Sequence, residues 1–131
     1  MTSIRSAKNK GSQLEIKTYR TLKSIYSDIQ RLGGIGQIME YDLLSEREGL
    51  AIECKRHKGF SWNELKKYFL KLEDRASQWK NHVLILQANQ QPPLVMIRGK
   101  ITRELYVTTF ENYFGLPLTK GSKELNSKTF L

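Results

Sequence analysis

Residues 50–55, with the sequence Leu-Ala-Ile-Glu-Cys-Lys, constrain the fold most strongly, because they have the pattern of a strand and still carry two opposite charges. Successive side chains of a strand point to opposite faces of a sheet, so Glu53 and Lys55 share one face. Cys54 belongs to the other, apolar face. We therefore expect its thiol to be buried as a small apolar group rather than to act as a nucleophile.

A second strand is predicted at residues 41–45, and a short turn joins it to the first one. If Ser45 pairs with Leu50 across that turn, Asp42 lies directly opposite Glu53. Opposed residues of an antiparallel pair have Cβ atoms about 4.5–5.5 Å apart. Two carboxylates held that close repel each other unless a cation lies between them. The hairpin therefore predicts a cation site.

A helix is predicted from residue 12 to about residue 26, and Glu15 lies within its apolar stripe. At about 100° per residue, Leu14 and Leu22 fall on the same face as Glu15. A carboxylate on an inward face costs free energy unless it finds a partner. Ser12 and Glu15 also match a capping box, which would make Glu15 structural. The inward position favours a role in the site, and both roles can hold in part.

The rest of the pattern indicates one α/β domain over residues 1–131, a length that suits a single core. We expect a central mixed sheet flanked by two helices, with the site where the hairpin meets the first helix. Ser61 and Glu64 form a capping box that opens the second helix, which runs to about residue 80. Its apolar face, expected to pack in the core or a dimer interface, carries Trp62, Leu65, Tyr68, Phe69, Leu72, Ala76 and Trp79. Further strands are predicted at residues 28–31, 83–88, 94–98 and 105–109, followed by a short aromatic element at 110–114.

The chain is strongly basic, with 22 Lys and Arg residues against 13 Asp and Glu residues and a net charge of +9. This charge favours a polyanion such as nucleic acid as the partner, although a merely basic, solvated surface is the alternative. Arg5, Lys8 and Lys10 lie in a polar segment, residues 1–10. We expect this segment to be a flexible arm that either follows phosphates or is simply disordered. Residues 119–131 are expected to form a loose polar tail.

Further basic residues lie close to the predicted hairpin. Arg56, His57 and Lys58 follow the charged strand directly and are candidate DNA contacts, although a lone histidine beside a turn is more often just exposed. Glycines at positions 33, 34 and 36 predict either a loop that closes over a substrate or an ordinary turn. No Gly-Lys-Ser/Thr follows these glycines, so a nucleotide-binding P-loop is not expected.

Cysteine content and hydropathy bear on the compartment. Cys54 is the only cysteine, so no intrachain disulfide can form and a reducing compartment is expected. The chain opens without the pattern of a signal peptide, and no apolar run is long enough to span a membrane. These features predict a cytoplasmic protein without a membrane partner, or one in the host cytoplasm if the source is viral.

The combination of Glu15 on a helix, Asp42 on a strand and Glu53-x-Lys55 on the next strand resembles the PD-(D/E)xK nuclease superfamily. Within it, the chain is most similar to the archaeal-type Holliday junction resolvases and their viral relatives. Lys10-Gly11-Ser12-x-x-Glu15 resembles the opening motif of that family, and Ile52-Glu53-Cys54-Lys55 resembles its central strand. The resemblance covers roughly residues 8–98.

The chain departs from the family pattern at two positions. Tyr41 precedes Asp42 where a proline is usual, although family members often lack that proline. Ile16 follows Glu15 where the resolvases commonly have an arginine. A phosphate contact from that position would therefore have to come from Lys10 or Lys17.

The resemblance implies a restriction-endonuclease-like α/β fold and a homodimeric, metal-dependent endonuclease that resolves four-way DNA junctions by phosphodiester hydrolysis. Asp42 and Glu53 supply hard oxygen ligands for Mg²⁺, for which Mn²⁺ would substitute, and the Cys54 carbonyl would complete the protein ligands. Glu15 would bind a second metal ion or hold a metal-bound water. Lys55 would orient or deprotonate the attacking water, or neutralise the transition state.

Three alternatives stay open at this point. The chain can be another PD-(D/E)xK endonuclease that nicks, restricts or repairs linear duplex DNA, or it can be a nucleic-acid-binding protein without catalysis. For the residues themselves, the alternative is a cross-strand salt-bridge cluster of Asp42, Glu53 and Lys55 on a solvated face. The inward position of Glu15 argues against that cluster, because a third acid adds repulsion that one lysine would not offset.

Overall fold

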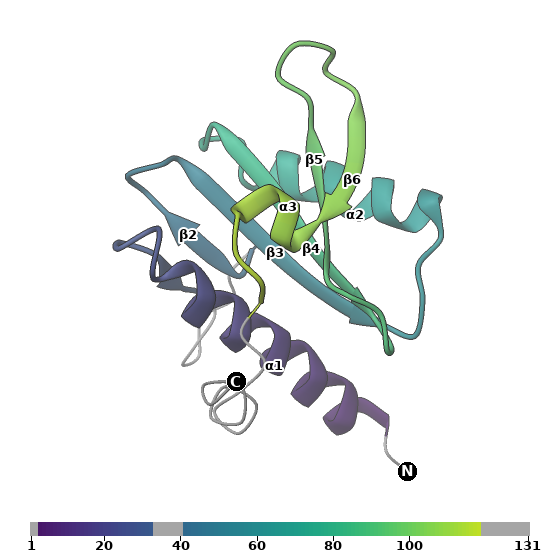
Figure 1. Ribbon diagram of the computed structural model, residues 1–131. Coiled ribbons are helices and arrows are strands. Elements are labelled where there is room, and N and C mark those ends of the chain that lie inside the picture. The colour runs from purple at the N-terminus through teal and green to yellow at the C-terminus, as the bar shows by residue number, and fades with distance from the viewer. Residues whose placement is uncertain (1–2, 33–40, 119–131) are drawn as a thin grey trace.

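The structure is a computed structural model that describes residues 3–32 and 41–118, with side chains described from Gln13 onward in the first helix. Figure 1 shows a central sheet with helices packed against it. The predicted glycine connection at positions 33, 34 and 36 and the predicted tail at 119–131 lie outside the described residues. The side chains of Arg5, Lys8 and Lys10 also lie outside them, so their predicted DNA contacts stay predictions.

The sheet has six strands that lie side by side in chain order. They are β1 (Gln30–Arg31), β2 (Leu43–Ser45), β3 (Leu50–His57), β4 (Asn81–Ala88), β5 (Leu94–Arg98) and β6 (Leu105–Thr109). β3 and β4 are parallel, and every other neighbouring pair is antiparallel. A parallel pair needs a long crossover connection, and here a helix supplies it. The predicted α/β class with a central mixed sheet is therefore confirmed.

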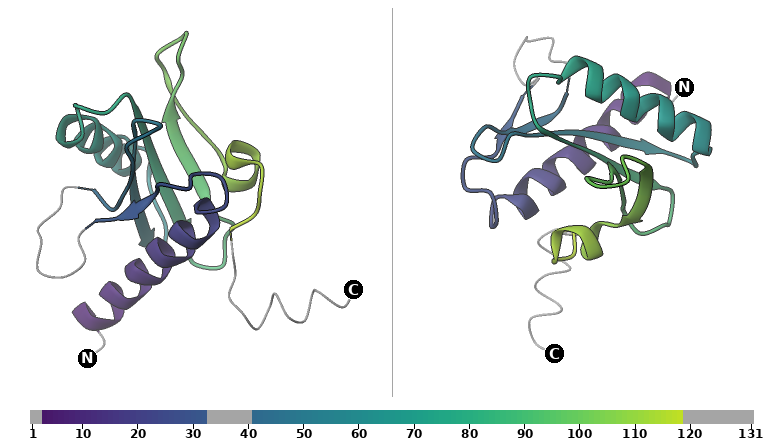
Figure 2. Two further views of the ribbon diagram at one scale, coloured as in Figure 1. Left: turned by 90° about the vertical axis from the view of Figure 1, so that its left-hand side faces the viewer. Right: turned by 90° about the horizontal axis from the view of Figure 1, so that it is seen from above.

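Helices cover both faces of this sheet. α2 (Trp62–Arg75) packs on one face, whereas α1 (Ser3–Leu22) and the short α3 (Phe110–Phe114) lie on the other, as the view from above in Figure 2 shows. The alternation along β3 follows this layering. Ile52 and Cys54 pack in the cluster with α1 and α3, and Ala51 packs against α2. Within the described residues, no helix has the length and apolar character needed to cross a bilayer.

α2 begins at the predicted capping box. The Ser61 hydroxyl accepts a hydrogen bond from the Glu64 backbone N–H at 3.2 Å, and the Ser61 N–H donates to the Glu64 carboxylate at 3.1 Å. Leu65, Phe69 and Leu72 form its buried face, as predicted. The helix ends at Arg75 rather than near residue 80. Trp62, the first residue of the helix, is 51% exposed and lies outside the apolar clusters that α2 forms with the sheet, so it is not part of the core, and for this residue only the predicted dimer interface stays open.

The bounds of α1 also differ from the prediction. The helix begins at Ser3 instead of residue 12, so the predicted flexible arm is helical and the capping box at Ser12 lies inside the helix. Residues 3–10 contain Ala, Lys and Arg and no proline, and therefore do not oppose a helix. α1 ends at Leu22, whose carbonyl accepts the Tyr26 N–H at 2.7 Å in the turn that follows.

Candidate active site

Three carboxylates from three parts of the fold meet beside the β2–β3 hairpin. Glu15 comes from α1, Asp42 from the residue just before β2, and Glu53 from β3. The Asp42 carboxylate is within hydrogen-bonding reach of both other carboxylates. The structure therefore brings together the three acids that the sequence analysis singled out.

The hairpin has the predicted register over most of its length. Ser45 pairs with Leu50, and Leu43 pairs with Ile52. Asp28 stabilises the turn, because its carboxylate accepts hydrogen bonds from the Ser45 hydroxyl at 2.7 Å and from the Arg47 N–H at 2.9 Å. These two hydrogen bonds lower the pKa of Asp28.

Asp42 departs from the predicted pairing at the open end of the hairpin. Its backbone N–H donates to the Ile52 carbonyl at 2.9 Å, although an in-register ladder would pair Asp42 with Glu53. Its carboxylate accepts the backbone N–H of Cys54 at 2.8 Å. Asp42 therefore bonds to the residues on either side of Glu53. The predicted direct pairing of Asp42 with Glu53 is therefore wrong in this detail, because Asp42 forms hydrogen bonds with the backbones of Ile52 and Cys54 instead.

Tyr41 fixes the backbone just before Asp42. It is buried, and its hydroxyl accepts a hydrogen bond from the Trp79 indole N–H at 2.7 Å. This hydrogen bond from the segment after α2, together with packing against Leu72 of α2, thus holds the position at which the resembled family usually has a proline. In the sequence, Trp79 falls within the apolar stripe of the second helix, and no spacing signal points to this contact.

The crowding of acids has an electrostatic consequence. Burial, followed by the hydrogen bond and charge of Glu53, raises the pKa of Asp42 from 3.8 to about 7. The hydrogen bonds from Cys54 and Glu15 act in the opposite direction and do not cancel this rise. Near neutral pH, Asp42 therefore holds a proton for a large part of the time.

Glu15 has a partner that the sequence analysis missed. Arg31 on β1 donates from Nε to the Glu15 carboxylate at 3.0 Å, and the two side chains are 38% and 14% exposed, respectively. Burial raises the pKa of Glu15, Arg31 acts against that rise, and the nearby Asp42 adds to it. The position of Arg31 near a loop gives no periodic signal, so its reach back to α1 could not be read from spacing.

Lys55 shares the α2 face of β3 with Glu53, as the alternation predicts. Its ammonium lies 5.0 Å from the centroid of the Tyr68 ring on α2, a cation–π distance. Ala51, on the same face, is fully buried, whereas Glu53 and Lys55 are half-buried. In the described part of the chain, Lys55 forms no ion pair.

The other predicted DNA contacts are spread over the molecule. Lys17 is half-buried and lines a separate cleft of about 760 Å³ with the β4–β5 turn and α3. Arg56 is half-buried and its Nε has no hydrogen-bond partner within the described residues. The His57 ring stacks on Phe60 at 4.8 Å, which is a structural contact, whereas Lys58 is exposed. None of these observations tests DNA binding.

The chemistry of the acids fits a divalent cation. Carboxylates are hard oxygen ligands, and Mg²⁺ is typically bound by one or two of them together with waters and substrate phosphates. Within residues 3–32 and 41–118, no three His, Cys, Asp and Glu side chains form a ready-made metal cage. A pair such as Asp42 and Glu53 does not need such a cage. The Cys54 thiol is buried at 8% exposure, as predicted, so only the carbonyl of this residue is suited to a hard cation.

No protein-family model matches the chain, and comparisons with curated proteins and with solved structures find no significant similarity. The chemistry of the site therefore rests on its own residues. These are two adjacent carboxylates, one of them with a pKa raised to about 7, a third acid paired with arginine, and a lysine on the same strand face as Glu53.

Proposed function

We propose that this chain is a divalent-metal-dependent DNA endonuclease and that its substrate is a four-way junction. The observation that carries the proposal is the convergence of Glu15, Asp42 and Glu53 from three parts of the chain. Strongly perturbed carboxylates cluster at functional sites more often than elsewhere. Repelling acids at a partly buried position also cost stability, which a protein tolerates where function needs them.

Asp42, Glu53 and the Cys54 carbonyl would hold Mg²⁺ or Mn²⁺. When bound, the ion would polarise the scissile phosphate and lower the pKa of a water molecule. Lys55 would orient or deprotonate that water, or balance the charge that develops on the phosphate. Glu15 would hold the water or a second ion. The buried Cys54 thiol is not suited to nucleophilic attack, so we infer direct hydrolysis.

The choice of DNA, and of a junction in particular, has separate support. The net charge of +9 favours a nucleic acid partner. The motif around Glu15 and the segment Ile52-Glu53-Cys54-Lys55 resemble those of Holliday junction resolvases. A helix, three antiparallel strands and a helical crossover to a parallel strand follow in an order compatible with a restriction-endonuclease-like fold. A homodimer would match the approximate twofold symmetry of a junction.

The test is a nicking assay on a synthetic four-way junction and on linear duplexes with the same sequences. We expect cleavage of the junction in Mg²⁺ or Mn²⁺, weak cleavage of the linear DNA, and no cleavage in EDTA. Equal rates on both substrates would remove the resolvase claim and favour a different endonuclease of the same superfamily. Salt-sensitive binding without cleavage in either metal would favour the non-catalytic alternative and reject the nuclease.

A further inference from the structure

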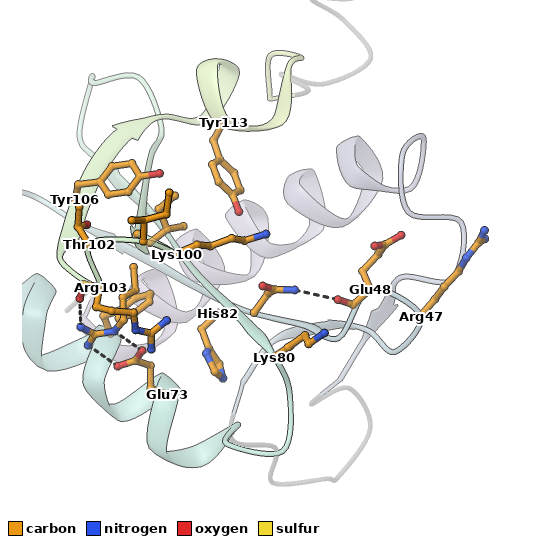
Figure 3. A pocket seen from close by; sticks show the side chains of 16 residues that line it. Arg47, Glu48, Glu73, Lys80, His82, Lys100, Thr102, Arg103, Tyr106 and Tyr113 are labelled. Carbon is orange, nitrogen blue, oxygen red and sulfur yellow. Dashed lines mark hydrogen bonds and ion pairs between the residues drawn. The ribbon is translucent and has the colours of Figure 1, made fainter.

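A second, strongly basic site lies at the end of the sheet where β3 and β4 begin. It is a cleft of about 1140 Å³, bounded by α2, the β5–β6 hairpin and α3 (Figure 3). Pockets for small ligands typically measure about 300–1,000 Å³, so this cleft suits a segment of a polymer better than a single small molecule. It contains none of the residues that the sequence analysis assigned to DNA contacts.

The cleft has an excess of positive charge. Its lining contains five Lys and Arg residues against two acids, Glu48 and Glu73. Glu73 is already bound by Arg98, which donates from Nε at 2.7 Å and from Nη2 at 2.8 Å. Arg98 in turn lowers the pKa of Glu73, which therefore stays charged. Of the five cations of the cleft, the other four form no ion pair with the described residues: Arg47, Lys80, Lys100 and Arg103.

The loop that carries part of this charge is held in a defined conformation. Arg98 donates from Nη1 to the Arg103 carbonyl at 2.6 Å, and the Gly99 N–H donates to the Glu104 carbonyl at 2.8 Å. Arg103 has a φ of +62°, a left-handed conformation that is uncommon for residues other than glycine. Such strain persists where surrounding contacts enforce it. Lys100 therefore extends from a preorganised hairpin rather than from a loose surface loop.

Two exposed aromatic rings line the same cleft. Tyr106 on β6 is 47% exposed, and Tyr113 on α3 is 39% exposed. In Figure 3 both rings lie on the same side of the Lys100 side chain, and the Tyr113 hydroxyl points toward that side chain. Ile101, at the tip of the hairpin, is 96% exposed. Cations interleaved with exposed aromatic rings are the combination by which proteins bind single-stranded nucleic acid, because every unpaired base offers a face for stacking.

We propose that this cleft binds a single-stranded segment of nucleic acid. Arg47, Lys80 and Lys100 contact its phosphates, and Tyr106 and Tyr113 stack against its unpaired bases. A duplex fits less well, because its bases are stacked on one another and offer no free face to the tyrosines.

The cleft is within reach of the candidate active site. Asn81 in the cleft pairs with Leu50, three residues before Glu53 on β3. At a rise of about 3.3 Å per residue, the distance along the strand is on the order of 10 Å. One strand of a branched DNA can therefore occupy the cleft while a neighbouring phosphate lies at the acids. The binding itself does not require cleavage.

The experiment measures fluorescence anisotropy of a labelled oligothymidylate of about twelve nucleotides, within the range of known single-strand site sizes, with the full chain in EDTA. The variant Lys80→Ala/Lys100→Ala removes two exposed cations of the cleft, and we expect binding to weaken by about tenfold or more at low salt. Lys66→Ala/Lys67→Ala removes the same charge from exposed positions of α2 outside the cleft. Equal weakening by the two double variants would overturn the proposal.

A second pair of variants tests the stacking contact. Tyr106→Ala should weaken binding of the oligothymidylate by about fivefold or more, whereas Tyr106→Phe keeps the ring and should bind as the wild type does. Inorganic polyphosphate should compete poorly, because it has no bases. If Tyr106→Ala has no effect and polyphosphate binds equally well, the cleft is a plain polyanion site and the proposal is wrong. Since all binding is measured in EDTA, loss of cleavage leaves this result unaffected, and loss of binding leaves the nuclease test intact.

Discussion

At the scale of single residues, Asp42 is where stability and the proposed function conflict most. Its pKa is 3.8 in the unfolded reference and about 7 in the folded protein, chiefly because of burial and the nearby Glu53. Between these two pH values, the folded protein holds a proton that the unfolded chain releases. The contribution of Asp42 to the free energy of unfolding therefore falls as pH rises from about 4 to about 7.

Asp42→Asn should stabilise the metal-free protein at alkaline pH. The difference of about three units between the folded and unfolded pKa of Asp42 corresponds to at most about 4 kcal/mol of the free energy of unfolding. The asparagine oxygen can still accept the hydrogen bond from the Cys54 N–H. We expect the gain at pH 8 in EDTA and little difference near pH 4, measured by urea denaturation. Glu46→Gln, at an exposed turn position, is the control and should show no such trend. An equal gain at both pH values would contradict the assignment of the raised pKa to Asp42.

The same position should control catalysis. Asp42→Asn and Glu53→Gln each remove a carboxylate that we propose holds the metal ion, so cleavage of the junction should fall by about 100-fold or more. Junction binding, measured by mobility shift in EDTA, should change little because neither residue is a cation. Glu46→Gln should cut at the wild-type rate. Wild-type cleavage by either active-site variant would show that these acids are not the site.

The sequence was informative at these residues for a definite reason. Glu15 and Glu53 lie in regular elements, where the 3.6-residue and two-residue periods fix the direction of a side chain. Arg31 and the Tyr41–Trp79 hydrogen bond depend on how loops close in space, which no local period encodes. The acids of the candidate site were therefore predictable, whereas the groups that hold and neutralise them were not.

At the scale of secondary structure, local sequence signals predicted the first and last residues of several elements correctly. β5, β6 and α3 have the predicted bounds, because turn residues or a glycine mark where they begin or end. Gly115, for example, ends α3 with a φ of +81°, a conformation that favours glycine. The start of α1 was missed because a polar helix without an apolar stripe resembles a disordered arm in composition.

The capping box of α2 allows a direct measurement at this scale. Ser61→Ala removes the side-chain acceptor for the Glu64 N–H and should reduce the free energy of unfolding by about 1 kcal/mol. Ser77→Ala, at an exposed position just after α2, is the matched control and should have little effect. Urea denaturation with an unchanged m-value would report this loss. A Ser61→Ala protein as stable as the wild type would mean that the box contributes nothing to α2.

At the scale of the whole molecule, metal binding and proton binding should compete for the same carboxylates. Because the folded protein largely holds a proton on Asp42 below about pH 7, an Mg²⁺ ion bound there as we propose would have to displace that proton. We expect Mg²⁺ to raise the melting temperature more at pH 8 than at pH 6, as followed by differential scanning fluorimetry. Asp42→Asn should lose most of this response. An Mg²⁺-induced increase in melting temperature that is equal at both pH values would show that the bound ion does not contact Asp42.

The hydrogen bond between Trp79 and Tyr41 makes tryptophan fluorescence a reporter of the candidate site. The chain has two tryptophans, Trp62 at the exposed start of α2 and Trp79, whose indole donates to Tyr41. In a Trp62→Phe variant, all indole emission would come from a ring linked by one hydrogen bond to the residue before Asp42. Emission wavelength and quenching would then report rearrangements of that backbone without an attached dye.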